Sequence, residues 1–131
     1  MSTETLVVLC VSGLAVAHVL APVYFKLSAN GVMTLAGPRD ALSEADGHLA
    51  ARVERAGANF KETLPIALAL LILVQVVDGQ SALSATGACT YLAARVLYVP
   101  AYLSGVPGVR TLIWSVSMGG LGLVAWAIAV A

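Results

Sequence analysis

The feature that most constrains this chain is a set of four long apolar stretches, which fill most of its 131 residues. About 20 apolar residues in a helix cross a hydrocarbon core about 30 Å thick. Segments 5–27, 58–77, 82–104 and 109–130 meet that length. The chain is 60% hydrophobic and 11% charged, whereas a soluble domain has about 45–50% apolar and about 25% charged residues. We therefore expect one all-α domain over 1–131, an integral membrane four-helix bundle.

The connections between the expected spans differ in length. The second and third spans are separated by "DGQS", and the third and fourth by "SGVPG", so both pairs are predicted to form tight hairpins. The connection over 28–50 is long, polar and compatible with helix, so the second helix is expected to start well outside the bilayer. Within it, Ser43 and Asp46 resemble a capping box.

The basic residues predict the orientation. All seven lie on the first or third connection or on the helix ends beside them: Lys26, Arg39, Arg52, Arg55, Lys61, Arg95 and Arg110. By the positive-inside rule these connections are cytoplasmic and both termini lie on the other side. The net charge is zero, which gives no reason to expect nucleic acid as a partner. Cys10 and Cys89 fall in apolar runs and indicate neither a metal site nor a disulfide.

Two polar stripes run into the expected spans from the cytoplasmic side. At 100° per residue, the polar residues at the start of the second span share a stripe about 80° wide. These residues are Arg52, Arg55, Asn59 and Glu62. A matching stripe on the third span carries Arg95, Tyr98 and Tyr102.

Glu62 and Arg95 are expected at similar depth in the membrane. An ionised group there costs about 2.5–3.5 kcal/mol, so the two are predicted to pair. Arg110 starts the fourth span and comes to the same cytoplasmic mouth. The whole set predicts a cationic pocket open to the cytoplasm, and four arginines with one glutamate match a ligand with two carboxylates and one ammonium. Glutathione has that inventory.

Other interpretations of the same residues stay open. The polar set could only hold the bundle together, and His18 is more simply a histidine that hydrogen-bonds inside the bundle. A transporter or proton relay is the weakest alternative, because the charges cluster at one mouth of the bundle.

Two sequence stretches resemble a known family. The second span carries "ERAGANFKETLP" (54–65), and the third leads into the fourth through "ARVLYVPAYLSGVPGVRTL" (94–112). Both resemble the MAPEG family, the membrane-associated proteins in eicosanoid and glutathione metabolism, in a bacterial-type form. The resemblance extends over nearly the whole chain.

That resemblance implies a homotrimer in a bacterial inner membrane, with glutathione bound between subunits on the cytoplasmic side. By family motif, glutathione-binding residues would be Arg55, Asn59, Glu62, Arg95 and Tyr102. Arg52 and Tyr98 would complete the same pocket. Arg110 matches the arginine that the prostaglandin E synthase branch places at the thiol, and we assign it to thiolate stabilisation, with Tyr102 as a supporting donor.

The chain also departs from that branch. Tyr98 stands where the branch has histidine, Trp114 where a tyrosine is expected, and the connection before Arg110 is one residue shorter. Eicosanoid chemistry is therefore not the expectation. The predicted function is a membrane-bound glutathione transferase with peroxidase-like activity, which acts on lipophilic electrophiles or hydroperoxides from the bilayer. The alternative is a non-enzymatic trimeric scaffold or ligand-binding protein.

Overall fold

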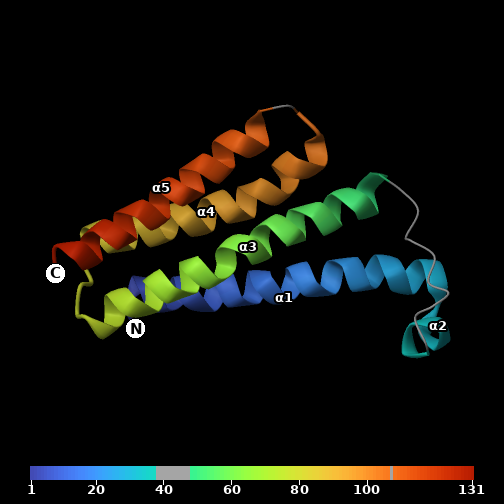
Figure 1. Cartoon of the computed structure of the whole chain (residues 1–131), viewed down its shortest axis with the longest axis horizontal. Coiled ribbons are helices and arrows are strands. Elements are labelled where there is room, and N and C mark those ends of the chain that lie inside the picture. Colours follow the sequence, from blue (N-terminus) through green and yellow to red (C-terminus); the bar gives the residue numbers. More distant parts are fainter. Residues whose placement is uncertain (38–47, 107) are drawn as a thin grey trace.

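The computed structural model describes residues 1–37, 48–106 and 108–131. Its helices are α1 (Thr3–Asn30), α2 (Val32–Ala36), α3 (His48–Val76), α4 (Ala82–Ser104) and α5 (Val109–Ala129). All of these except the short α2 are long and apolar enough to cross a membrane. They run side by side, with both termini at one end of the bundle and the α4–α5 turn at the other (Figure 1). The predicted all-α bundle of four spanning helices is confirmed.

The helix bounds differ from the predicted spans mainly at the ends. The Ser2 side chain caps α1 by accepting from the Thr5 backbone N–H, so this helix begins before the first strongly apolar residue. Helix α3 already begins at His48, well ahead of its apolar part, as expected. The short α2 was not predicted. Arg39 and the Ser43–Asp46 pair lie outside the described residues.

The two predicted hairpin turns are built from local signals. Ser81 and Ser84 form a reciprocal capping box at the start of α4. Gly105 ends α4 in the left-handed conformation, with a φ of 72°, which a residue with a side chain rarely adopts. Pro22 and Pro65 lie inside helices that continue past them, as membrane helices tolerate.

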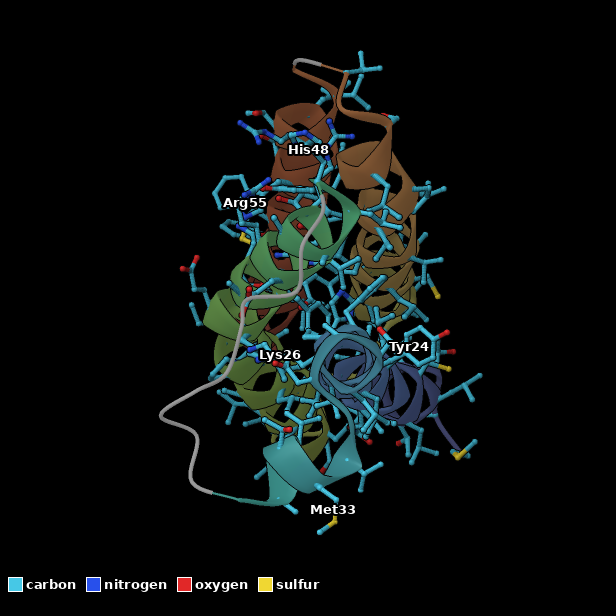
Figure 2. All side chains as sticks on the ribbon, turned by 90° about the vertical axis from the view of Figure 1, so that its right-hand side faces the viewer. Tyr24, Lys26, Met33, His48 and Arg55 are labelled. Atoms are coloured by element: carbon cyan, nitrogen blue, oxygen red, sulfur yellow. The ribbon has the colours of Figure 1, made fainter. Side chains whose placement is uncertain are left out.

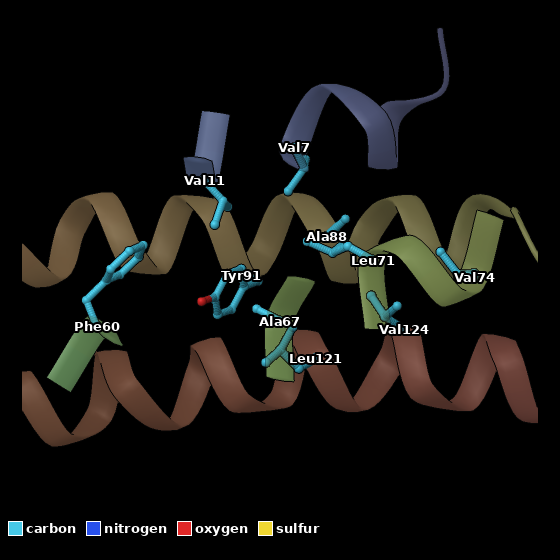
Figure 3. Close-up of a cluster of buried hydrophobic side chains, with 10 residues drawn as sticks. All are labelled: Val7, Val11, Phe60, Ala67, Leu71, Val74, Ala88, Tyr91, Leu121 and Val124. Atoms are coloured by element: carbon cyan, nitrogen blue, oxygen red, sulfur yellow. The ribbon is translucent and has the colours of Figure 1, made fainter. Parts of the chain in front are cut away.

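Helices α4 and α5 pack more closely than any side chain would allow. A Cβ on Gly120 would lie 2.7 Å from the Gly87 carbonyl oxygen, and one on Gly87 would lie 2.6 Å from the Gly120 carbonyl oxygen. Facing glycines of this kind let membrane helices approach backbone to backbone. A buried apolar cluster then joins all four spanning helices (Figure 3). It contains Val7, Val11, Phe60, Ala67, Leu71, Val74, Ala88, Tyr91, Leu121 and Val124.

A polar cluster closes the end of the bundle that carries the termini. Glu4 is only 2% exposed, and the Ser84 hydroxyl donates to its Oε1 at 2.5 Å. The Thr5 hydroxyl donates to the Gln75 side chain beside it. Neither Glu4 nor Ser84 is among the residues predicted from the sequence to be functional. These bonds tie α1 to α3 and α4, so the cluster holds the helix ends in register.

Candidate functional site

Arg95 of α4 is the largest of the fully buried side chains, with an exposure of 1%. Its Nη1 donates to Asn59 Oδ1 at 3.1 Å and its Nη2 donates to Thr63 Oγ1 at 2.6 Å. The guanidinium carbon lies 5.5 Å from the Tyr91 ring centre and 5.7 Å from that of Tyr98. Contacts of this kind between a cation and aromatic rings are attractive, and more so where water is excluded. Arg95 therefore joins α3 to α4 through neutral partners.

The predicted pairing of Arg95 with Glu62 is wrong in this structure. Among the described residues, the hydrogen-bond partners of the Arg95 side chain are Asn59 and Thr63, and Glu62 is exposed on α3. The reason is helical geometry. Asn59 and Thr63 are one turn apart and lie on one face, whereas Glu62 is rotated about 100° from Thr63. Sequence reasoning missed Thr63, although its spacing from Asn59 is the signal that could have found it.

A cavity of about 310 Å³ opens beside this network, between the start of α3 and the α4–α5 turn. Arg55 Nε donates to the Tyr102 hydroxyl at 3.2 Å, and the Arg110 guanidinium carbon lies 5.6 Å from the Tyr102 ring centre. Arg52 Nη1 donates to the Leu103 carbonyl at 2.6 Å. We call this the cationic cavity. It is lined by Arg52, Arg55, Ala101, Tyr102, Gly105, Val106 and Arg110.

A second cavity, of about 210 Å³, shares Arg110 with the first. Its lining residues are Asn59, Tyr98, Arg110, Thr111 and Trp114. Arg110 therefore stands where the two cavities meet. Most of the sequence-predicted site residues line one of these two cavities, and two of them, Arg95 and Glu62, line neither. Arg95 supports the wall through its bond to Asn59, and Glu62 is exposed on α3.

The arginines of this site have no carboxylate partner in the described part of the chain. Within those residues the ion pair that forms is Lys26 with Glu54, at 3.4 Å on the surface. Arg55 and Lys26, both labelled in the end-on view (Figure 2), also line one further cavity together with Glu54. A guanidinium stays charged in any protein and suits the bidentate binding of carboxylates. Among the described residues, these guanidinium groups are therefore not paired with a carboxylate, an arrangement that suits an anionic ligand.

Comparison with known families decides what kind of protein carries this site. A family model described as the MAPEG family matches residues 5–130. The chain belongs to the MAPEG family. The same comparisons found no match among curated proteins and none among solved structures. With four helices able to cross a bilayer, this MAPEG protein is an integral membrane protein. Its family indicates glutathione-dependent transferase or peroxidase chemistry, or eicosanoid synthesis.

The residues of the site fit glutathione as the ligand of a MAPEG protein. Arg52, Arg55 and Arg110 present guanidinium groups to one cavity, which suits two carboxylates. Tyr102 adds a hydroxyl, already held by Arg55. A volume of about 310 Å³ lies at the lower end of the range of about 300–1,000 Å³ for small-molecule pockets.

Proposed function

We propose that this MAPEG protein is a membrane-bound glutathione transferase, with peroxidase activity toward lipid hydroperoxides. We further propose that it works as a homotrimer in a bacterial inner membrane, with both termini on the non-cytoplasmic side. One observation carries the proposal: Arg52, Arg55 and Arg110 surround one cavity, and none has a carboxylate partner in the described chain. A dianionic tripeptide supplies the charge that these arginines lack.

Binding follows from the placement of the cations. Arg52 and Arg55 lie on successive turns at the start of α3, and each is already oriented by an oxygen of α4. Groups held in place before the ligand arrives lose less freedom on binding. Glu62 is exposed on α3 and is the carboxylate of the predicted set, so we assign it to the ligand's ammonium group.

Thiol activation is assigned to Arg110. Glutathione, when bound, supplies the nucleophilic sulfur. A free thiol has a pKa of about 8.5, and a fixed guanidinium favours its thiolate form by charge interaction. Arg110 lines both cavities and lies beside the Tyr102 ring, with Val106 and Trp114 as apolar neighbours. Tyr102, whose hydroxyl accepts from Arg55, can donate a further hydrogen bond.

Ultraviolet difference absorbance on addition of glutathione tests this assignment. We expect a thiolate band that disappears in Arg110→Ala, together with a loss of turnover of about 10²–10³-fold, the usual effect of removing one preorganised charge-stabilising donor. Binding should weaken only modestly. Lys61→Ala is the matched control, because Lys61 is an exposed cation of α3 outside both cavities. Unchanged turnover in Arg110→Ala would refute the assignment.

The second candidate is a non-enzymatic trimeric scaffold. It is favoured by the Arg95 network, which joins α3 to α4 through Asn59 and Thr63 without any ligand. The scaffold hypothesis expects glutathione to leave the thermal stability unchanged and Glu62→Gln to weaken the assembly. The transferase hypothesis expects glutathione to raise the melting temperature.

A further inference from the structure

A third cavity, of about 190 Å³, lies among α1, α3 and α4, and we call it the apolar cavity. Two of its wall residues, Val53 and Ala56, come directly after Arg52 and Arg55 of the cationic cavity. Each therefore points about 100° away from its arginine around the axis of α3. Leu103 lines the apolar cavity, and its backbone carbonyl accepts from Arg52. The two cavities share no lining residue, but this bond connects a residue of one wall to a residue of the other. The apolar cavity is lined by Leu14, Ala17, His18, Ala21, Val53, Ala56, Val99 and Leu103.

The polar side chain on this wall, His18, is held by its own helix. Its Nδ1 lies 2.8 Å from the Leu14 carbonyl oxygen. A carbonyl can only accept, so Nδ1 carries a proton and donates it. His18 is 9% exposed, and its ring stacks on that of Phe60, with ring centres 4.5 Å apart and planes 8° from parallel. Every other lining side chain is a hydrocarbon, so the cavity suits an apolar occupant.

The position of the cavity in the bundle indicates the route by which an occupant enters. Its α1 residues lie near the middle of a spanning helix, its α3 residues near the start of α3 and its α4 residues near the end of α4. Ala17 is exposed, so the cavity opens sideways on the surface of α1. An apolar wall without a neighbour forfeits its dispersion contacts. Because the wall is apolar and opens on the side of a spanning helix, we expect its occupant to enter from the bilayer.

The volume limits the shape of the occupant. An apolar cavity of about 150 Å³ holds one benzene molecule, so 190 Å³ corresponds to roughly six to eight carbon atoms. Small side chains, Ala17, Ala21 and Ala56, line it on two helices. A space of this size between small side chains suits the end of one alkyl chain better than a fused ring system.

We propose that the apolar cavity binds the end of an unbranched alkyl chain that belongs to the lipophilic second substrate. This inference rests on the proposed transferase function and specifies its substrate class. The chain lies against Leu103, and its reactive end extends toward Arg52, which lines the cationic cavity and donates to the Leu103 carbonyl. Lipid tails are as apolar as this wall, so the cavity selects by shape and position and not by hydrophobicity. Linear electrophiles are preferred over bulky ones for that reason.

The test uses the full chain in nanodiscs and a series of trans-2-alkenals from five to ten carbons. The sulfur adds to the β-carbon of the alkenal and the α-carbon takes a proton, so no leaving group complicates the series. In the wild type, kcat/KM should rise with chain length. Ala21→Phe fills the cavity and should lower the ratio of decenal to pentenal about tenfold, since a displaced chain has nowhere to pack. Leu20→Phe, at a neighbouring residue that is 58% exposed, is the matched control.

The thiolate band and a spin-labelled stearate separate the possible failures. A wild type without a thiolate band refutes the transferase function itself. The cavity is then judged by the immobilised fraction of the spin label, which should fall in Ala21→Phe and not in Leu20→Phe. The proposal is overturned if the thiolate band is normal and the decenal-to-pentenal ratio of kcat/KM is the same in Ala21→Phe and wild type. The cavity is then assigned to bilayer lipid. If Ala21→Phe does not assemble, Ala17→Leu at the exposed mouth should lower the ratio in the same direction, and an unchanged ratio there overturns the proposal as well.

Discussion

The bundle has one polar cluster at each end, and the two differ in how their charged groups are paired. At the end with the termini, the Glu4 carboxylate accepts from Ser84 and Gln75 accepts from Thr5. Acceptors there meet hydroxyl donors of the same chain. At the other end, Arg52, Arg55 and Arg110 bind neutral oxygens or lie over a ring.

The two clusters differ in whether the charged group finds a compensating partner within the chain. A single carboxylate with hydroxyl donors needs no further ion, because hydrogen bonds to a charged group stabilise it directly. Several guanidinium groups with neutral partners keep their net charge, and that charge attracts anions. We infer that the closed cluster with Glu4 serves stability and that the open cluster with the arginines serves binding.

The largest expected effect is at Arg95, the buried member of the open cluster. Arg95→Ala leaves a void and removes the donors to Asn59 and Thr63, which should destabilise the protein by about 2–4 kcal/mol. The rise in melting temperature on adding glutathione should also shrink, because Asn59 lines a cavity of the site. Differential scanning fluorimetry in detergent, with and without glutathione, measures both.

Arg95→Met separates packing from hydrogen bonding at this position. Methionine fills much of the space but cannot donate to Asn59 or Thr63. We expect it to recover part of the stability and none of the response to glutathione. A methionine variant that responds to glutathione like the wild type would show that Arg95 acts by volume alone.

The next effect tests the closed cluster. Ser84→Ala leaves the Glu4 carboxylate buried without its donor, at a cost of about 1.5–3 kcal/mol. The melting temperature should fall while the glutathione-induced rise stays at its wild-type size. Thr86→Ala is the control, since Thr86 is exposed on the same helix and its hydroxyl bonds to the Ala82 carbonyl of that helix. A lost glutathione response in Ser84→Ala would contradict the division between the two clusters.

A smaller effect is expected at the contact of α4 with α5, where Gly87 lies about one turn from Ser84 of the closed cluster. Gly120→Ala places a Cβ 2.7 Å from the Gly87 carbonyl oxygen, so the helices must separate, at a cost of about 1–3 kcal/mol. Because Arg110 is carried by α5, the thiolate band should weaken as well. Gly119→Ala is an adjacent control with nothing within 4 Å of its Cβ, and it should be neutral or slightly stabilising. Equal melting temperatures in the two variants would count against the close contact.

The fold and most of the open cluster were predictable from sequence because each depends on one helix at a time. Apolar length sets the four spans, and helical spacing puts Arg52, Arg55 and Asn59 on one stripe. The bonding partner of Arg95 was not predictable in that way. Whether Thr63 or Glu62 meets it depends on how α3 is rotated against α4, and a charge-pairing argument chose the wrong neighbour.

The closed cluster was missed for a related physical reason. In the sequence, Glu4 is an ordinary polar residue in the first turn of a helix, and Ser84 is explained by its place in a helix cap. Their bond requires the relative height of α1 and α4, which is set by packing along the whole bundle and by no local signal.

The smallest effect is expected at the surface ion pair between Lys26 and Glu54. Their side chains are 44% and 63% exposed, and exposed pairs contribute about 0–1 kcal/mol. Lys26→Gln and Glu54→Gln should each change the free energy of unfolding by no more than about 0.5 kcal/mol, and added salt should remove even that difference. A loss above 1 kcal/mol in thermal unfolding of either variant would mean that this pair is buried in the assembled protein. Because both residues border cavities on the outer side of α1 and α3, that result would place a neighbouring subunit on this face and connect the pair to the open cluster.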